Sequence, residues 1–87
     1  MNLTEALDKA AQTSHRLEEI GAKINDIRIE DEEGDFAVSI WIGAPLPPGD
    51  TDIPPMEVEH LEDLDSDNHG AYLYTTQYNG CHIHAFP

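Results

Sequence analysis

Carboxylates are the side chains with the most chemical potential in this sequence, because of where they gather. Residues 30–67 contain thirteen Asp and Glu residues and no Lys or Arg. They are Glu30, Asp31, Glu32, Glu33, Asp35, Asp50, Asp52, Glu57, Glu59, Glu62, Asp63, Asp65 and Asp67. Solubility alone does not require such segregation, and like charges without counter-charges repel one another. We therefore interpret these residues as a binding surface for a positively charged partner. The alternative is an acidic surface that only keeps the protein soluble.

One part of this stretch has the spacing of a calcium loop. Asp63, Asp65 and Asp67 occupy alternate positions, as the first oxygen ligands of an EF-hand loop do. The sixth position of such a loop is Asn68 instead of glycine, and the twelfth is Tyr74 where a bidentate Glu is needed. A calcium-responsive or metal-responsive structural module built on this loop is the alternative function.

The histidines and the single cysteine offer less chemistry. His82 and His84 lie at i,i+2 and share one face of a strand, a spacing that can bind zinc, and His60 or His69 could approach them. Packing across strands is the favoured interpretation. Cys81 and His82 point to opposite faces of a strand and cannot act as a pair. We expect neither catalysis nor a bound metal or cofactor.

Length and composition limit the possible functions. The 87 residues predict a single domain, 1–87, and the lone cysteine favours a reducing compartment. The first twenty residues contain no continuous apolar run, so we expect no signal peptide, no membrane span and a cytoplasmic protein. A net charge of -14 predicts no direct binding to nucleic acid or to anionic membranes.

An amphipathic helix is expected at the start of the chain, near residues 3–20. Asn2 and Glu5 resemble a capping box, and Gly21 could end the helix. The apolar stripe that should face the core is Leu3, Leu7, Ala10, Ser14, Leu17, Ile20 and Ile24.

Two hairpins are expected after this helix. The alternation from Ile24 to Ile42 predicts one hairpin, with its turn within 31–35 and Trp41 either covering the second sheet face or exposed. Five prolines interrupt residues 43–55, and residues 56–61 suggest a short strand or a helical turn. Asn79 and Gly80 predict a second hairpin that pairs Tyr78 with Cys81. The expected fold class is α+β, with an N-terminal amphipathic helix packed on an antiparallel sheet of about four strands.

This size, charge and plan resemble a group of small acidic proteins encoded by phages. Alternate carboxylates on an extended strand are about 6.6 Å apart, a charge density of the same order as that of a phosphate backbone. The acidic stretch and the helix-plus-sheet plan resemble DNA-mimic inhibitors such as the uracil-DNA glycosylase inhibitor and some anti-CRISPR proteins, and acidic immunity proteins fit equally well. The resemblance implies a non-catalytic inhibitor that occupies a basic, nucleic-acid-binding site on another protein or complex. The oligomeric state stays open.

Overall fold

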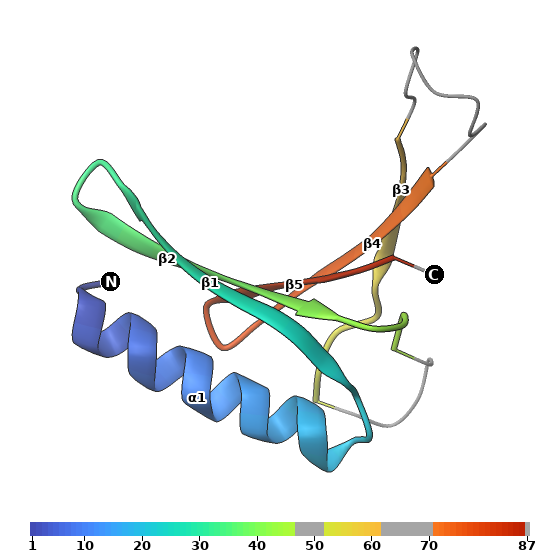
Figure 1. Ribbon diagram of the computed structural model, residues 1–87, viewed down its shortest axis with the longest axis horizontal. Helices are drawn as coiled ribbons and strands as arrows, with labels where there is room; N and C mark the ends of the chain where they lie inside the picture. Colours follow the sequence, from blue (N-terminus) through green and yellow to red (C-terminus); the bar gives the residue numbers. More distant parts are fainter. Residues whose placement is uncertain (47–51, 62–70, 87) are drawn as a thin grey trace.

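The computed structural model describes residues 1–46, 52–61 and 71–86. One helix, α1 (Leu3–Glu19), is followed by five strands (Figure 1). The strands are β1 (Ile24–Glu32), β2 (Asp35–Ile42), β3 (Glu57–Leu61), β4 (Ala71–Tyr78) and β5 (Cys81–Ala85). The expected α+β class, with an N-terminal helix on a sheet, is confirmed.

Helix α1 begins as expected but buries a different stripe. The side chain of Asn2 accepts a hydrogen bond from the backbone N–H of Glu5 at 2.8 Å and caps the first turn. The buried residues are Ala6, Ala10, Thr13, Ser14 and Leu17. Leu3 and Leu7 are about half exposed, so the predicted stripe was wrong at its N-terminal end. Small side chains at positions 6, 10 and 13 let this part of the helix approach the sheet closely.

Both predicted hairpins are present, and each turns through two residues in the left-handed region. Glu33 and Gly34 join β1 to β2 with φ of 55° and 87°, and Asn79 and Gly80 join β4 to β5 with φ of 54° and 78°. Two consecutive positive φ values match the right-handed twist of the paired strands. The predicted register Tyr78 with Cys81 is confirmed.

The sheet differs in detail from the expected antiparallel one. Its strand order is β1-β2-β5-β4-β3. Strand β3, where a short strand or a helical turn was expected, brings the number of strands to five instead of about four. The two hairpins meet where β2 pairs with β5 in parallel, with Ile40 beside Ile83. The chain crosses from β2 to the far edge before it returns through β4, and this crossing makes the β2–β5 pair parallel.

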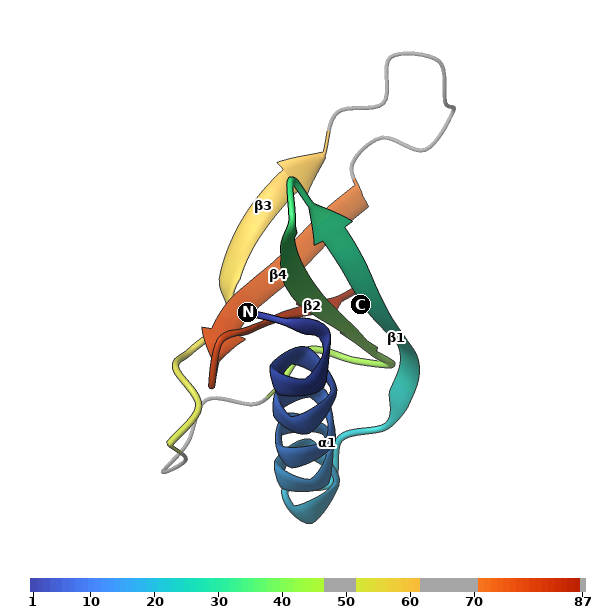
Figure 2. The same ribbon diagram turned by 90° about the vertical axis from the view of Figure 1, so that its left-hand side faces the viewer.

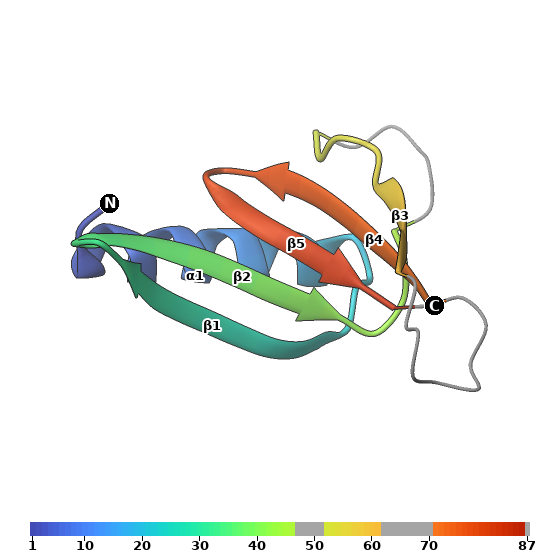
Figure 3. The ribbon, with the colours of Figure 1, turned by 90° about the horizontal axis from the view of Figure 1, so that it is seen from above.

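The core lies on one face of the sheet. Helix α1 packs against β1, β2 and β5, while Ile53 in the connection to β3 is buried in the same core. Leu17, Ile40 and Ile83 are fully buried there. Figure 2 shows the helix on one side only, and Figure 3 looks onto the other side. We call this second side, on which none of the described residues forms a helix, the open face. Within the described ranges, no helix is long and apolar enough to cross a membrane.

Candidate functional site

A continuous row of side chains crosses all five strands on the open face. Asp26 of β1 pairs with Trp41 of β2, which pairs with His84 of β5. His84 in turn pairs with Thr75 of β4, and Thr75 pairs with Glu57 of β3. Because paired residues point to the same face of a sheet, these five side chains share the open face. The row has a carboxylate at each edge and aromatic rings in the middle.

Trp41 is the centre of an aromatic cluster on this face. Its ring stacks on His84 with centroids 4.6 Å apart and on Phe86 with centroids 5.4 Å apart. His82 continues the cluster, with its ring 6.3 Å from that of His84. Trp41 is half-buried, so it covers the second face of the sheet, one of the two expected positions. Sequence reasoning missed the cluster because it did not predict that β2 and β5 are neighbours. A signal was present, since each strand has an aromatic residue at a position that alternates with its buried residues.

Five of the thirteen predicted binding residues have the phase of the open face. Asp35 of β2 is one of them, because it pairs with Glu32, and the other four form two separate pairs. Glu30 and Glu32 alternate with Asp31 on β1, in phase with Asp26, and Glu57 and Glu59 are in phase on β3. All four side chains are exposed. The pairs lie on the two edge strands, and four strand spacings together with the offset along the strands put them roughly 25 to 30 Å apart. The structure therefore places acidic groups on both sides of the aromatic cluster.

The four basic residues of the chain do not neutralise these pairs. Arg28 shares the open face but binds Asp26 at 2.8 Å on its own strand. Arg16 binds Asp52 and Glu19 on the helix side, and Lys9 donates a hydrogen bond to Asn79. Lys23 lies between α1 and β1. Among the described residues, Glu30, Glu32, Glu57 and Glu59 thus form no ion pair.

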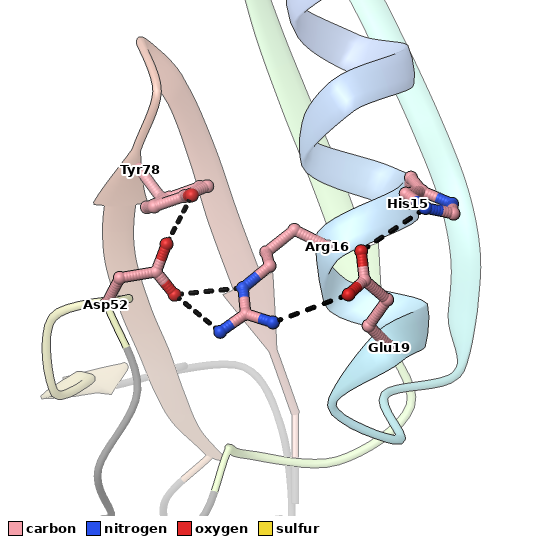
Figure 4. Close-up of polar contacts among 5 residues, drawn as sticks. All are labelled: His15, Arg16, Glu19, Asp52 and Tyr78. Atoms are coloured by element: carbon pink, nitrogen blue, oxygen red, sulfur yellow. Dashed lines mark hydrogen bonds and ion pairs between the residues drawn. The ribbon is translucent and has the colours of Figure 1, made fainter.

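Unlike the four glutamates of the open face, Asp52 lies on the helix side, within a polar network (Figure 4). Arg16 Nε donates to Asp52 Oδ1 at 2.9 Å, and the Tyr78 hydroxyl donates to Asp52 Oδ2 at 2.5 Å. The bond from Tyr78, followed by that from Arg16, lowers the pKa of Asp52, and the same carboxylate raises the pKa of Tyr78. Glu19 also contacts Arg16, at 3.7 Å, and His15, at 3.2 Å. The network therefore joins three parts of the chain, which are α1, Asp52 before β3, and strand β4.

The remaining predicted residues are at the β1–β2 turn or outside the described ranges. Asp31 accepts a hydrogen bond from the backbone N–H of Gly34 at 2.9 Å, which stabilises the turn. Asp35 forms an ion pair with the amino group of Met1, and this bond lowers the pKa of Asp35. Glu33 occupies the turn itself and is exposed. Outside the described residues lie Asp50, Glu62, Asp63, Asp65 and Asp67, and with them the predicted calcium loop.

The histidine and cysteine positions show packing. Within residues 1–46, 52–61 and 71–86, no three His, Cys, Asp or Glu side chains are grouped as metal ligands are. Cys81 is fully buried on the helix side, where Thr13 Oγ1 donates a hydrogen bond to its sulfur at 3.3 Å. Burial raises the pKa of the Cys81 thiol.

Comparison with models of protein families, with curated proteins and with solved structures finds no match to this chain. The open face, with its two pairs of carboxylates around an aromatic cluster, is accordingly interpreted from its own geometry.

Proposed function

We propose that this protein is a non-catalytic inhibitor whose open face occupies a basic, nucleic-acid-binding site on another protein or complex. The observation that carries the proposal is the set of four exposed carboxylates, Glu30, Glu32, Glu57 and Glu59, on one face without ion-pair partners in the described structure. A cationic partner would relieve their repulsion.

The layout of the face supports an interface with a protein. Aromatic side chains at the centre of an interface contribute much of its binding free energy, while charged groups around them set specificity and association rate. Trp41, on β2, and Phe86, directly after β5, lie between the two edge strands that carry the carboxylate pairs. The two carboxylates of each pair are about 6.6 Å apart along their β-strand, a charge density of the same order as the one phosphate per about 3.4 Å of axis on a DNA strand. A protein surface that evolved to hold phosphates would meet charges of the right sign and similar density.

Charge reversal tests the proposal. The first variant carries Glu30→Lys and Glu32→Lys, and the second carries Glu57→Lys and Glu59→Lys. The matched control carries Asp8→Lys and Glu18→Lys, which change net charge equally but lie exposed on α1, in the other layer. The partner is captured from a lysate with immobilised wild type and identified, and its affinity is then measured for all variants at low and high salt.

We expect the captured protein to bind nucleic acid and to release it when the wild-type protein is added. Each close charge pair that is lost should weaken binding by about tenfold. The α1 control should bind nearly as well as wild type. Equal affinity of wild type and both open-face variants, or a partner whose nucleic acid is not displaced, would contradict the proposal.

A further inference from the structure

A hollow of about 380 Å³ lies on the open face beside the first residue of β3. Glu57, Thr75, Gln77, His82 and His84 line it, together with residues 54–55. The strand pairing explains the opening, because β3 begins at Glu57 while β4 continues past Thr75 to Tyr78 without a β3 partner. The Thr76 hydroxyl donates to the carbonyl of Pro54 at 3.0 Å and fixes the chain there. Prolines 54 and 55 cannot extend the ladder by donating.

The lining of this hollow is rich in hydrogen-bond acceptors. Glu57 offers a carboxylate, Gln77 an amide oxygen and Thr75 a hydroxyl. Nδ1 of His84 is buried and has no hydrogen-bond partner. Desolvation, followed by the charge of His82, lowers the pKa of His84, so its ring is neutral at neutral pH and does not repel a cation in the hollow. No Lys or Arg lines the hollow, and Arg28, in the neighbouring row, is paired with Asp26.

The shape favours a planar cation over a spherical one. The rings of His82 and His84 both line the hollow and lie within 14° of parallel, with centroids 6.3 Å apart. A guanidinium group is planar, stacks on aromatic faces and carries five donors, whereas a lysine ammonium is a compact, strongly hydrated charge. A volume of about 380 Å³ is at the small end of ligand sites and is large enough to admit an arginine side chain.

We propose that the hollow at Glu57 binds an arginine side chain of the partner, with the guanidinium against the rings of His82 and His84 and its donors on Glu57 and Gln77. This inference rests on the proposed function, because the arginine belongs to the basic partner that the open face is proposed to bind.

The test needs no partner protein. The probe is the blocked tripeptide acetyl-Gly-Arg-Gly-amide, titrated at low salt into the full chain while NMR follows the signals of His82, His84, Gln77 and Trp41. Its controls are the same peptide with Lys, and with citrulline, the neutral isostere of arginine. The variants are Glu57→Gln and Gln77→Ala, with Glu32→Gln as the matched control at the other end of the face.

We expect saturable shifts confined to the hollow, weaker binding of the Lys peptide and none of the citrulline peptide. Glu57→Gln should weaken binding by about tenfold through the loss of a charge-assisted hydrogen bond, and Gln77→Ala by less. Glu32→Gln should bind as wild type does, and the dispersed spectrum of each variant checks its fold. Equal binding of Arg and Lys peptides, shifts centred on the β1–β2 turn, or an unaltered affinity in Glu57→Gln would overturn the inference. If those results occur while charge reversal still abolishes partner binding, the arginine site is wrong and the proposed function stands.

Discussion

Tyr78 donates a hydrogen bond to Oδ2 of Asp52 at 2.5 Å and so ties β4 to a loop residue 26 positions earlier in the chain. The other carboxylate oxygen of Asp52 binds Arg16 of α1. One side chain therefore holds together three segments that are distant in sequence. This tie holds Asp52, which precedes β3, on the helix side of the sheet.

Asp52→Ala should lower the unfolding midpoint temperature by a few degrees, because both contacts disappear together. It should also move the pKa of Tyr78 back toward its usual value, since the bond to Asp52 is the main cause of the increase. Calorimetry and an ultraviolet titration of tyrosine measure the two effects. Asp26→Ala is the matched control, as Asp26 pairs only with Arg28 on its own strand. An unaltered tyrosine titration in Asp52→Ala would refute the assignment.

The two leucines of α1 should differ sharply in their response to truncation. Leu17 is fully buried, whereas Leu7 is 53% exposed. Leu17→Ala should cost about 2 to 5 kcal/mol of unfolding free energy, and Leu7→Ala should alter it by less than about 0.5 kcal/mol. Helix propensity changes equally in both variants, so urea denaturation reports burial alone. Similar losses in both would show that α1 is rotated from the described orientation.

His84 should make the stability of the protein depend on pH below neutrality. Its folded pKa is lowered from 6.5, so the folded state binds the proton less well than the unfolded chain does. The stabilisation is complete above pH 6.5 and is lost as pH falls through the lower folded pKa. Its neighbours on this face are Trp41, Phe86 and His82, with Glu57 on the adjacent lining of the hollow.

His84→Phe keeps a ring beside Trp41 but cannot take up a proton. Unfolding free energies of this variant and of wild type are compared at about pH 7.5 and about pH 5.5. Wild type should lose stability relative to the variant at the lower pH, and titration of the many carboxylates cancels in the difference. Parallel pH profiles would mean that His84 does not titrate abnormally.

Cys81 should resist thiol reagents in the native state. It has no exposed surface, and burial raises its pKa, so little thiolate is present. Labelling by a disulfide reagent should be slow in buffer and fast in denaturant. The Leu17→Ala variant should be labelled faster than wild type, because labelling then requires unfolding, which is easier in the variant. Equal rates in buffer and in denaturant would contradict the buried position.

The parts of this fold that depend on neighbours in sequence could be predicted. The Asn2 cap and the Asn79-Gly80 turn act within a few residues, and both are where the sequence indicated. The parallel pairing of β2 with β5 could not be predicted, because no local signal fixes which edges of two hairpins meet. The aromatic cluster around Trp41 depends on that pairing.

The candidate site also has a part that could be predicted from the sequence and a part that could not. Charge segregation within residues 30–67 is visible in the sequence, but the use made of each carboxylate is not. Asp52 and Asp31 accept internal hydrogen bonds, while Glu57 borders the hollow. These three roles follow from tertiary contacts, and a count of charges treats them alike. Leu3 and Leu7 show the same limit, since periodicity identifies an apolar stripe without showing how far the sheet extends beneath it.

The parallel seam between β2 and β5 also has a consequence for how quickly the chain folds. Each hairpin closes a two-residue turn and can form within microseconds, whereas Val38 must find Cys81 across most of the second half of the chain. Contacts between residues so distant in sequence slow folding, because the entropy of closing the intervening loop is lost before the contact stabilises anything. Docking of the two hairpins is thus expected to limit the rate. Both turns are then already formed in the transition state, so substitutions that weaken a turn should slow folding in proportion to the stability lost. Substitutions at Ile40 or Ile83 should also speed unfolding, because their contacts are completed only after docking, and stopped-flow folding and unfolding rates measure the difference.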